Sequence, residues 1–201
     1  MKDLIISPHV DDEVLGCGGI LSSSSHVYFC GLNLLPHVTK EHLIDDLKTV
    51  AEFLKYSWDS EFRIEANRYQ YYGEQYWVNV FQKIINEQQP DRIFLPYPSY
   101  NQDHRLIYDT AMTALRPHDE IFFVKKVLVY ELLDCFWYNM DYEVNYFVPI
   151  NIEQKLEAYR RYKTLVRQHR SLEQIEALAR LRGQHIGVVH AEAFIIKRWV
   201  D

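Results

Sequence analysis

The chain has few cysteines, and none of them stand in a pair that could form a redox or metal motif. Cys17, Cys30 and Cys135 are widely spaced in a chain of 201 residues. An odd number of distant thiols is untypical of a disulfide framework or of a cysteine-rich zinc site. We therefore expect reduced thiols and a cytoplasmic protein.

Long hydrophobic runs are also missing. No apolar stretch approaches the roughly 20 residues that a membrane-spanning helix needs. The apolar run at residues 4–6 is too short for a signal peptide, because polar and charged residues interrupt it from position 9 onward. We expect no membrane insertion and no export.

Positive charge is in the minority, with 22 lysines and arginines against 28 aspartates and glutamates and a formal net charge of −6. Nucleic-acid binding depends on basic surfaces that neutralise phosphates. The composition therefore disfavours a non-specific nucleic-acid binder. Aromatic residues are plentiful instead, with 15 tyrosines and 10 phenylalanines. They are typical of aromatic-lined ligand surfaces or of a packed interface in a homo-oligomer.

Apolar strand-like runs alternate with helical patterns along the chain. The strand-like runs lie at residues 4–6, 27–32, 92–95, 127–130 and 194–200, with a weaker candidate at 62–64. Helical spacing predicts helices over 40–55, 75–87, 104–115, 152–165 and 172–181, the last ending at Gly183. The alternation predicts an α/β fold, with helices on both faces of a mostly parallel sheet. Residues 116–150 break the rhythm, but no Pro-, Gly- or Ser-rich linker divides the chain, so we expect one domain over residues 1–201.

The densest group of chemically active side chains follows the first predicted strand. Residues 7–13 read Ser-Pro-His-Val-Asp-Asp-Glu, with one imidazole and three carboxylates inside five residues. Crowded carboxylates repel one another and raise one another's pKa, so a purely structural segment seldom contains them. Sites in α/β folds lie where strands end and loops begin.

His9 and Asp12 lie three positions apart, so their side chains can converge if Asp12 begins a helical turn. A catalytic zinc site needs three protein ligands and an open position, and His104, which follows the predicted strand at 92–95, is the best third candidate. Asp11 would then serve as a general base for a metal-bound water, and Glu13 would mainly favour the helix start. The plainer alternative is a solvated loop with a helix-capping aspartate.

Three segments carry a resemblance to a known family. Residues 8–13, followed by the glycines of residues 16–19, resemble the Pro-His-Pro-Asp-Asp-Glu opening motif of the LmbE-like (PIG-L) N-deacetylases. Residues 103–105, Asp-His-Arg, resemble the second motif, and residues 182–194 resemble the closing pattern. A dinucleotide loop fits the glycines less well, because Leu21 occupies the third glycine position.

This resemblance implies a Rossmann-like three-layer sandwich and one divalent metal, usually zinc, bound by two histidines and an aspartate. It implies hydrolysis of an N-acetyl group on an amino sugar or a sugar conjugate. Carried over by position, His9, Asp12 and His104 would bind the metal and Asp11 would be the general base. Ferrous iron accepts the same ligands.

The chain departs from the family pattern near the second motif. Asn101 stands where many members have a histidine that helps to hold the tetrahedral intermediate, and Ser99 stands where a tyrosine often assists, with Tyr100 beside it. Asparagine can donate a hydrogen bond but cannot carry a proton as imidazolium. We take Asn101 as a catalytic candidate and leave open which group stabilises the oxyanion.

Further candidates are less specific. Asp103 and Glu192 are carboxylates that could hold a ligand histidine, and Arg68 and Tyr100 could contact substrate. The aromatic residues 69–77 fit either sugar stacking or a subunit interface, and the basic residues 155–170 are typical of a solvated helix face, with docking of a phosphorylated substrate as the alternative.

Two other functions remain open at this stage. A metal-dependent phosphoesterase usually needs two metals and more carboxylate ligands than the sequence offers. A non-catalytic sugar-binding protein could have kept the fold, and the residues at positions 99 and 101 are its support.

Overall fold

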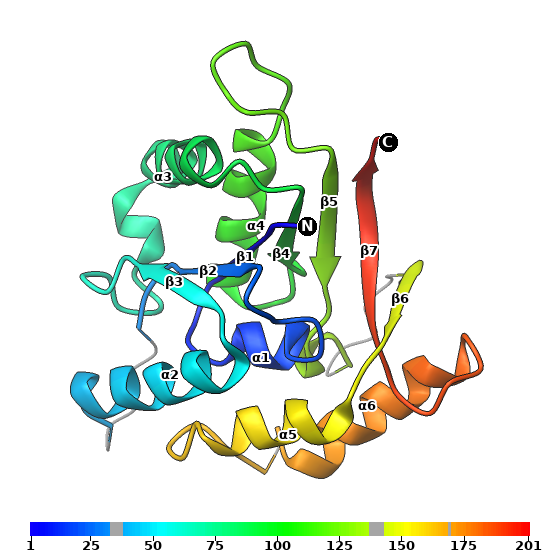
Figure 1. The fold of residues 1–201 in the computed structure, drawn as a ribbon. Coiled ribbons are helices and arrows are strands. Elements are labelled where there is room, and N and C mark those ends of the chain that lie inside the picture. Colours follow the sequence, from blue (N-terminus) through cyan, green and yellow to red (C-terminus); the bar gives the residue numbers. More distant parts are fainter. Residues whose placement is uncertain (33–37, 137–142, 169) are drawn as a thin grey trace.

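A seven-stranded sheet lies at the centre of the protein, which is described here from a computed structural model (Figure 1). The structure describes residues 1–32, 38–136, 143–168 and 170–201. The strands are β1 (Asp3–Ser7), β2 (Ser25–Phe29), β3 (Ser57–Ser60), β4 (Arg92–Pro96), β5 (Lys126–Tyr130), β6 (Tyr146–Pro149) and β7 (Ala191–Trp199). Their order is β3-β2-β1-β4-β5-β7-β6, and β7 runs antiparallel to both of its neighbours while the first five are parallel.

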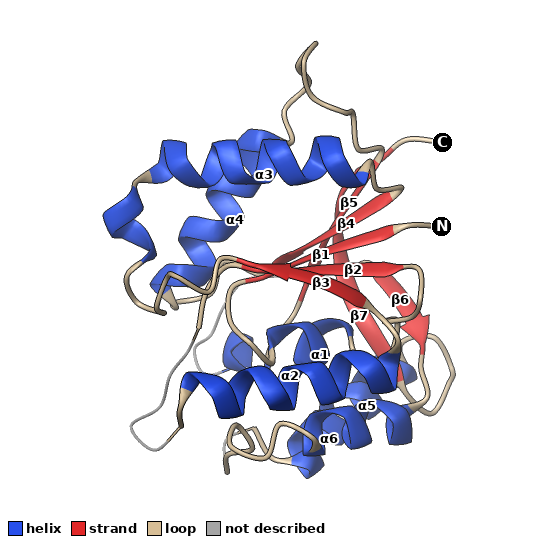
Figure 2. Cartoon of the chain, turned by 60° about the vertical axis from the view of Figure 1, so that its left-hand side comes forward, coloured by secondary structure: helices blue, strands red, loops and turns tan. Residues whose placement is uncertain are grey.

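Helices cover both faces of this sheet (Figure 2). They are α1 (Asp12–Cys17), α2 (Lys40–Leu54), α3 (Glu74–Gln88), α4 (Gln102–Ala114), α5 (Ile152–Arg160) and α6 (Leu172–Gln184), with short 3₁₀ turns η1 (Tyr69–Tyr72) and η2 (Leu133–Phe136). Helices α3 and α4 lie on one face, and α1, α2, α5 and α6 lie on the other. The predicted three-layer α/β sandwich with a mostly parallel sheet is thus confirmed.

Strand β1 shows why the first apolar run is continuous. Ile5 packs into the core on the side of α1, α2 and α5, whereas Leu4 and Ile6 pack on the side of α3 and α4. All three side chains are fully buried. A central parallel strand is covered on both faces, so both sets of alternating side chains are apolar.

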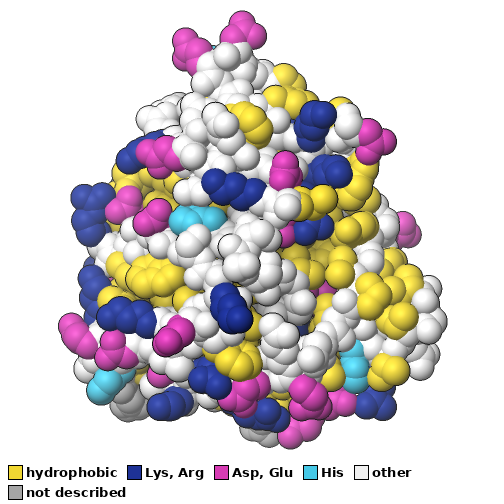
Figure 3. Space-filling view, viewed as in Figure 1, with side chains coloured by type: hydrophobic (Ala, Val, Ile, Leu, Met, Phe, Trp, Pro, Cys, Tyr) yellow, Lys and Arg dark blue, Asp and Glu magenta, His cyan; other side chains and the backbone are white. Residues whose placement is uncertain are grey.

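The surface carries charges of both signs, as the similar numbers of acidic and basic residues predict. Acidic and basic side chains are intermixed over the face shown in Figure 3. Within the described ranges, no helix is both long enough and apolar enough to cross a membrane.

Several predicted elements were wrong or displaced. Residues 62–64 form turns, and the edge strand is β3, whose polar, partly exposed sequence carries no apolar run. Strand β6 lies in the irregular 116–150 region, of which residues 137–142 fall outside the described part. Helix α5 ends at Arg160 because tight turns follow it. Gly183 lies inside α6, where a Cβ atom would meet the carbonyl oxygens of Val188 and Val189 at 2.6 and 2.7 Å.

The strand order fixes where a site can form. After β1 the chain continues to β2 on one side, while β4 pairs with β1 on the other side. In doubly wound sheets, ligands bind at the carboxyl ends of the strands where the order reverses. That position is the space beyond β1 and β4.

Candidate metal centre

The carboxyl ends of β1 and β4 bring three potential metal ligands together. His9 and Asp12 follow β1, and His104 lies in the first turn of α4, after β4. Asp12 Oδ2 lies 3.2 Å from both His9 Nδ1 and His104 Nε2, and the two nitrogens are 3.3 Å apart. All three residues are buried. The three atoms therefore form a nearly equilateral triangle.

This triangle fits a tetrahedrally coordinated divalent metal. Nitrogen and oxygen ligands about 2.0–2.1 Å from a zinc ion lie about 3.3 Å from one another in a tetrahedron. In addition, Asp12 Oδ1 is buried and has no hydrogen-bond partner among the described residues, although buried polar atoms are normally paired. The predicted ligands thus have the spacing and the chemistry of a metal site with one open position.

The pKa values of Asp12 and His9 depend on the neighbouring charged side chains. Burial by itself raises the pKa of Asp12, but the neighbouring His104 and His9 hold it well below its usual range. Burial lowers the pKa of His9, whereas hydrogen bonds with Asp103 and Asp12 raise it to about 9. A metal would replace the proton on His9, so metal binding should release protons.

Asp103 holds His9 in position. Its Oδ2 accepts hydrogen bonds from His9 Nε2 at 2.9 Å and from the backbone N–H of Asn67 at 2.7 Å. This leaves Nδ1 of His9 directed at the other ligands. Asn101 caps α4, because its Oδ1 accepts from the backbone N–H of Asp103 at 2.9 Å. Its side-chain amide NH₂ is the group that can donate to a substrate.

Asp11 occupies an unusual backbone conformation, with φ of 103°. It precedes α1 without capping it through its side chain. Its carboxylate is buried and accepts from Arg170 Nη1, which lies 3.2 Å from Oδ2. Burial raises the pKa of Asp11 to about 6, while Arg170 lowers it. No local motif marks Arg170, and the prediction of a solvated basic face over residues 155–170 is wrong for this residue, whose side chain is paired with Asp11.

Glu13 lies in the first turn of α1, as expected, but it is not a solvated helix-start residue. It is fully buried, and its Oε1 accepts hydrogen bonds from the hydroxyls of Tyr56 and Tyr162. Its Oε2 accepts from the backbone N–H of Asp11 at 3.1 Å. Burial raises the pKa of Glu13 to about 8, although Tyr162 lowers it. Glu13 therefore stabilises the backbone conformation of Asp11 through this hydrogen bond.

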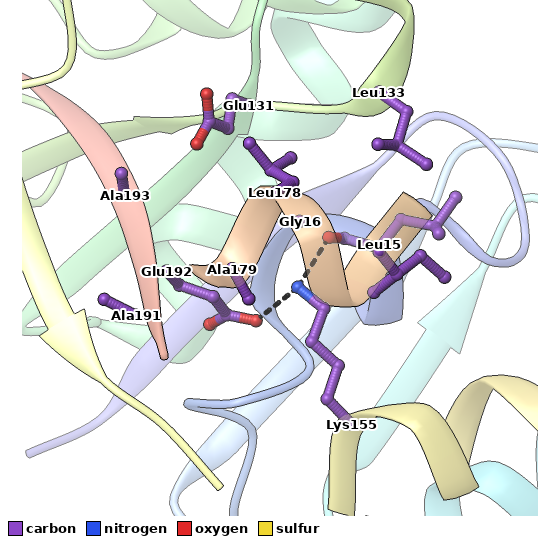
Figure 4. A pocket seen from close by; sticks show the side chains of 11 residues that line it. Leu15, Gly16, Glu131, Leu133, Lys155, Leu178, Ala179, Ala191, Glu192 and Ala193 are labelled. Atoms are coloured by element: carbon purple, nitrogen blue, oxygen red, sulfur yellow. Dashed lines mark hydrogen bonds and ion pairs between the residues drawn. The ribbon is translucent and has the colours of Figure 1, made fainter. Parts of the chain in front are cut away.

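Glu192 does not hold a ligand histidine, so that prediction was wrong. Its Oε1 accepts from Lys155 Nζ and from the backbone N–H of Gly19, each at 2.7 Å. Figure 4 shows this pair beside Leu15, whose carbonyl also accepts from Lys155. Lys155 is therefore buried and paired, so it does not belong to a solvated helix face either.

The remaining candidates lie on segments that border the site. Tyr100 is 64% exposed, and the side chain of Arg68 is 63% exposed and pairs with Glu65 at 3.1 Å. In the aromatic segment, Tyr69 and Trp77 are fully buried, and the hydroxyl of Tyr69 donates to the carbonyl of Pro8. These two rings thus support the loop that carries His9.

Residues far from the motifs complete the site. Ser99 is buried, and its hydroxyl contacts both His104 and Asp134. Asp134 comes from η2, four residues after the end of β5. An acid shortly after a predicted strand was the signal that could have found it.

No protein-family model matches this chain, and no curated protein sequence does either. Solved structures share its fold. GalB, the 4-carboxy-2-hydroxymuconate hydratase from Pseudomonas putida KT2440, has a TM-score of 0.79 at 18% identity, covering 100% of this chain and 99% of that one. The N,N'-diacetylchitobiose deacetylase from Pyrococcus horikoshii has a TM-score of 0.75 at 20% identity, covering 98% and 84%. A zinc-inhibited form of the teicoplanin deacetylase Orf2 has a TM-score of 0.73 at 15% identity, covering 100% of both. At these identities the similarity establishes a common fold, which deacetylases and a hydratase both use.

Proposed function

We propose that this protein is a metal-dependent hydrolase that removes an N-acetyl group from an amino sugar or a sugar conjugate. The observation that carries the proposal is the buried triangle of His9, Asp12 and His104, with the carboxylate of Asp11 directly beside it in the chain. The deacetylases that share the fold support the same conclusion. We propose zinc as the metal, with ferrous iron as the alternative that accepts this ligand set.

The chain's own residues supply the proton transfers. The metal, when bound, lowers the pKa of a water ligand and polarises the acyl oxygen. Asp11 accepts a proton from the attacking water at a carboxylate oxygen, acting as the general base. The protonated Asp11 then returns the proton to the leaving nitrogen. One water and the N-acetyl amide of the substrate are consumed, and acetate and the free amine of the substrate are formed.

The proposed substrate contacts come from the segments that border the site. The amide NH₂ of Asn101 would donate to the developing oxyanion, and Tyr100 and Arg68 would contact the sugar. We further propose that residues 1–201 act as one domain and that the enzyme works in the cytoplasm.

One experiment tests the proposed reaction against its rivals. The zinc-loaded protein is incubated with a panel of N-acetylated amino sugars and sugar nucleotides, with phosphate monoesters, and with unsaturated carboxylic acids as hydratase substrates. We expect release of acetate in equal amount to new primary amine, and loss of both in Asp11→Asn. Turnover of phosphate esters or hydration of a double bond, with no acetate from any acetamide, would contradict the proposal.

A further inference from the structure

We propose that Asp134 is a positioning residue that acts through the hydroxyl of Ser99 to fix the tautomer and the orientation of His104. The inference rests on the proposed metal site, because it concerns how one ligand of that site is held.

The hydrogen-bond distances indicate which group donates and which accepts between Asp134, Ser99 and His104. Ser99 Oγ lies 2.7 Å from Asp134 Oδ2 and 3.3 Å from His104 Nδ1. A hydroxyl has a single hydrogen, and the shorter contact, to a carboxylate, takes it. Toward His104, Ser99 Oγ can then act only as an acceptor, so the hydrogen of the neutral imidazole lies on Nδ1.

This tautomer is the one that a metal site needs. With the hydrogen on Nδ1, the lone pair of His104 lies on Nε2, which is the atom 3.2 Å from Asp12 Oδ2. Asp134 Oδ2 is 3.8 Å from His104 Nδ1, which is too long for a direct hydrogen bond. The serine hydroxyl therefore transmits the effect of the carboxylate.

Burial makes the arrangement effective. His104 is fully buried, Ser99 is 2% exposed and Asp134 is 7% exposed, so bulk water competes little for these hydrogen bonds. Ser99 follows β4, His104 lies on α4 and Asp134 follows β5. The three residues tie neighbouring strand ends to the ligand-bearing helix.

The inference also narrows the choice of oxyanion partner. Because the single hydrogen of the Ser99 hydroxyl is donated to Asp134, this hydroxyl is not available to donate to a substrate. The role that the sequence left open between positions 99 and 101 therefore falls to Asn101 or Tyr100.

Metal affinity tests this inference without relying on activity. Asp134→Asn removes the negative charge that holds the serine hydrogen, so the serine hydroxyl can donate to His104 Nδ1 and the imidazole hydrogen can lie on Nε2. We expect zinc affinity, measured by competition with a chromogenic chelator, to fall by about 10–100-fold. The visible absorption of the Co²⁺-loaded protein should change with it. Ser99→Ala, which removes the connecting hydroxyl and adds no bulk, should cause a similar loss.

A double-mutant comparison makes the test specific. If Asp134 acts through Ser99, the double variant Ser99→Ala/Asp134→Asn should bind zinc with about the same affinity as the single variant that binds it less tightly. Asp103→Asn, which loosens His9 instead, should multiply with Asp134→Asn and serves as the matched control. Wild-type affinity in both single variants, or a fully additive loss in their combination, would overturn the inference. Zinc binding that survives His104→Ala would instead overturn the proposed metal site itself.

Discussion

Replacing Glu13 with glutamine should remove much of the pH dependence of stability in the metal-free protein. Glu13 is fully buried, and burial raises its pKa from 4.5 to about 8. In the folded protein the carboxyl is therefore mostly neutral at pH 7, whereas in the unfolded chain it ionises near 4.5. Glutamine has the shape of the neutral acid: its oxygen can accept from the N–H of Asp11, and its NH₂ group can donate to the hydroxyl oxygens of Tyr56 and Tyr162 once their O–H groups turn away from it.

The sign and size of the effect follow from the two pKa values. A carboxyl with a raised folded-state pKa contributes stability that is fully present below about pH 4.5 and is lost as the pH rises through about 8. Each unit of difference is worth about 1.4 kcal/mol. The wild-type protein should therefore lose on the order of 3–5 kcal/mol relative to Glu13→Gln across this interval.

Urea unfolding of chelator-treated protein between pH 5 and about 8.5 measures this difference. The two proteins should be close in stability at the acidic end and should diverge as the pH rises, with the variant becoming the more stable. Glu173→Gln, at a fully exposed glutamate, is the control and should show no divergence. Parallel stability curves for wild type and Glu13→Gln would refute the argument that Glu13 is neutral in the fold.

Three further substitutions test other parts of the structure. Asp11→Asn should keep the metal and lower the turnover of acetate release by about 10²–10⁴-fold, since asparagine tolerates a positive φ; unchanged turnover would exclude Asp11 as the base. Lys155→Met should cost about 3–5 kcal/mol in urea unfolding because it leaves Glu192 buried without a cation, and adding Glu192→Gln should recover most of the loss; an equal loss in the double variant would contradict this. Gly16→Ala would place a Cβ atom 2.2 Å from the ring of Tyr130, so it should cost about 1–3 kcal/mol, and an unchanged Tm would contradict this packing.

The convergence of His9, Asp12 and His104 could be predicted because its signals are local in the sequence. His9 and Asp12 follow one apolar strand and His104 follows another, and parallel strands direct their carboxyl ends to the same edge. The pairing of β1 with β4 then brings the two segments together. The α/β class could be predicted as well, because apolar runs and helical spacing alternate along the chain.

The rest of the site depends on contacts that no local pattern encodes. Arg170 reaches Asp11 from 159 positions away, and Tyr162 reaches Glu13 from 149 positions away. Asp134 lies in an irregular region without a motif. Glu192 was misplaced because its strand turns the side chain toward Lys155, an ion pair that only the packing of α5 reveals.

The central claim is that His9, Asp12 and His104 bind one catalytic metal ion. Elemental analysis of the purified protein, of Asp11→Asn and of His104→Ala after zinc loading and gel filtration measures it most directly. We expect one zinc per chain in the wild-type protein and in Asp11→Asn, and none retained in His104→Ala. Absence of tightly bound metal in the wild-type protein, or full retention in His104→Ala, would contradict it.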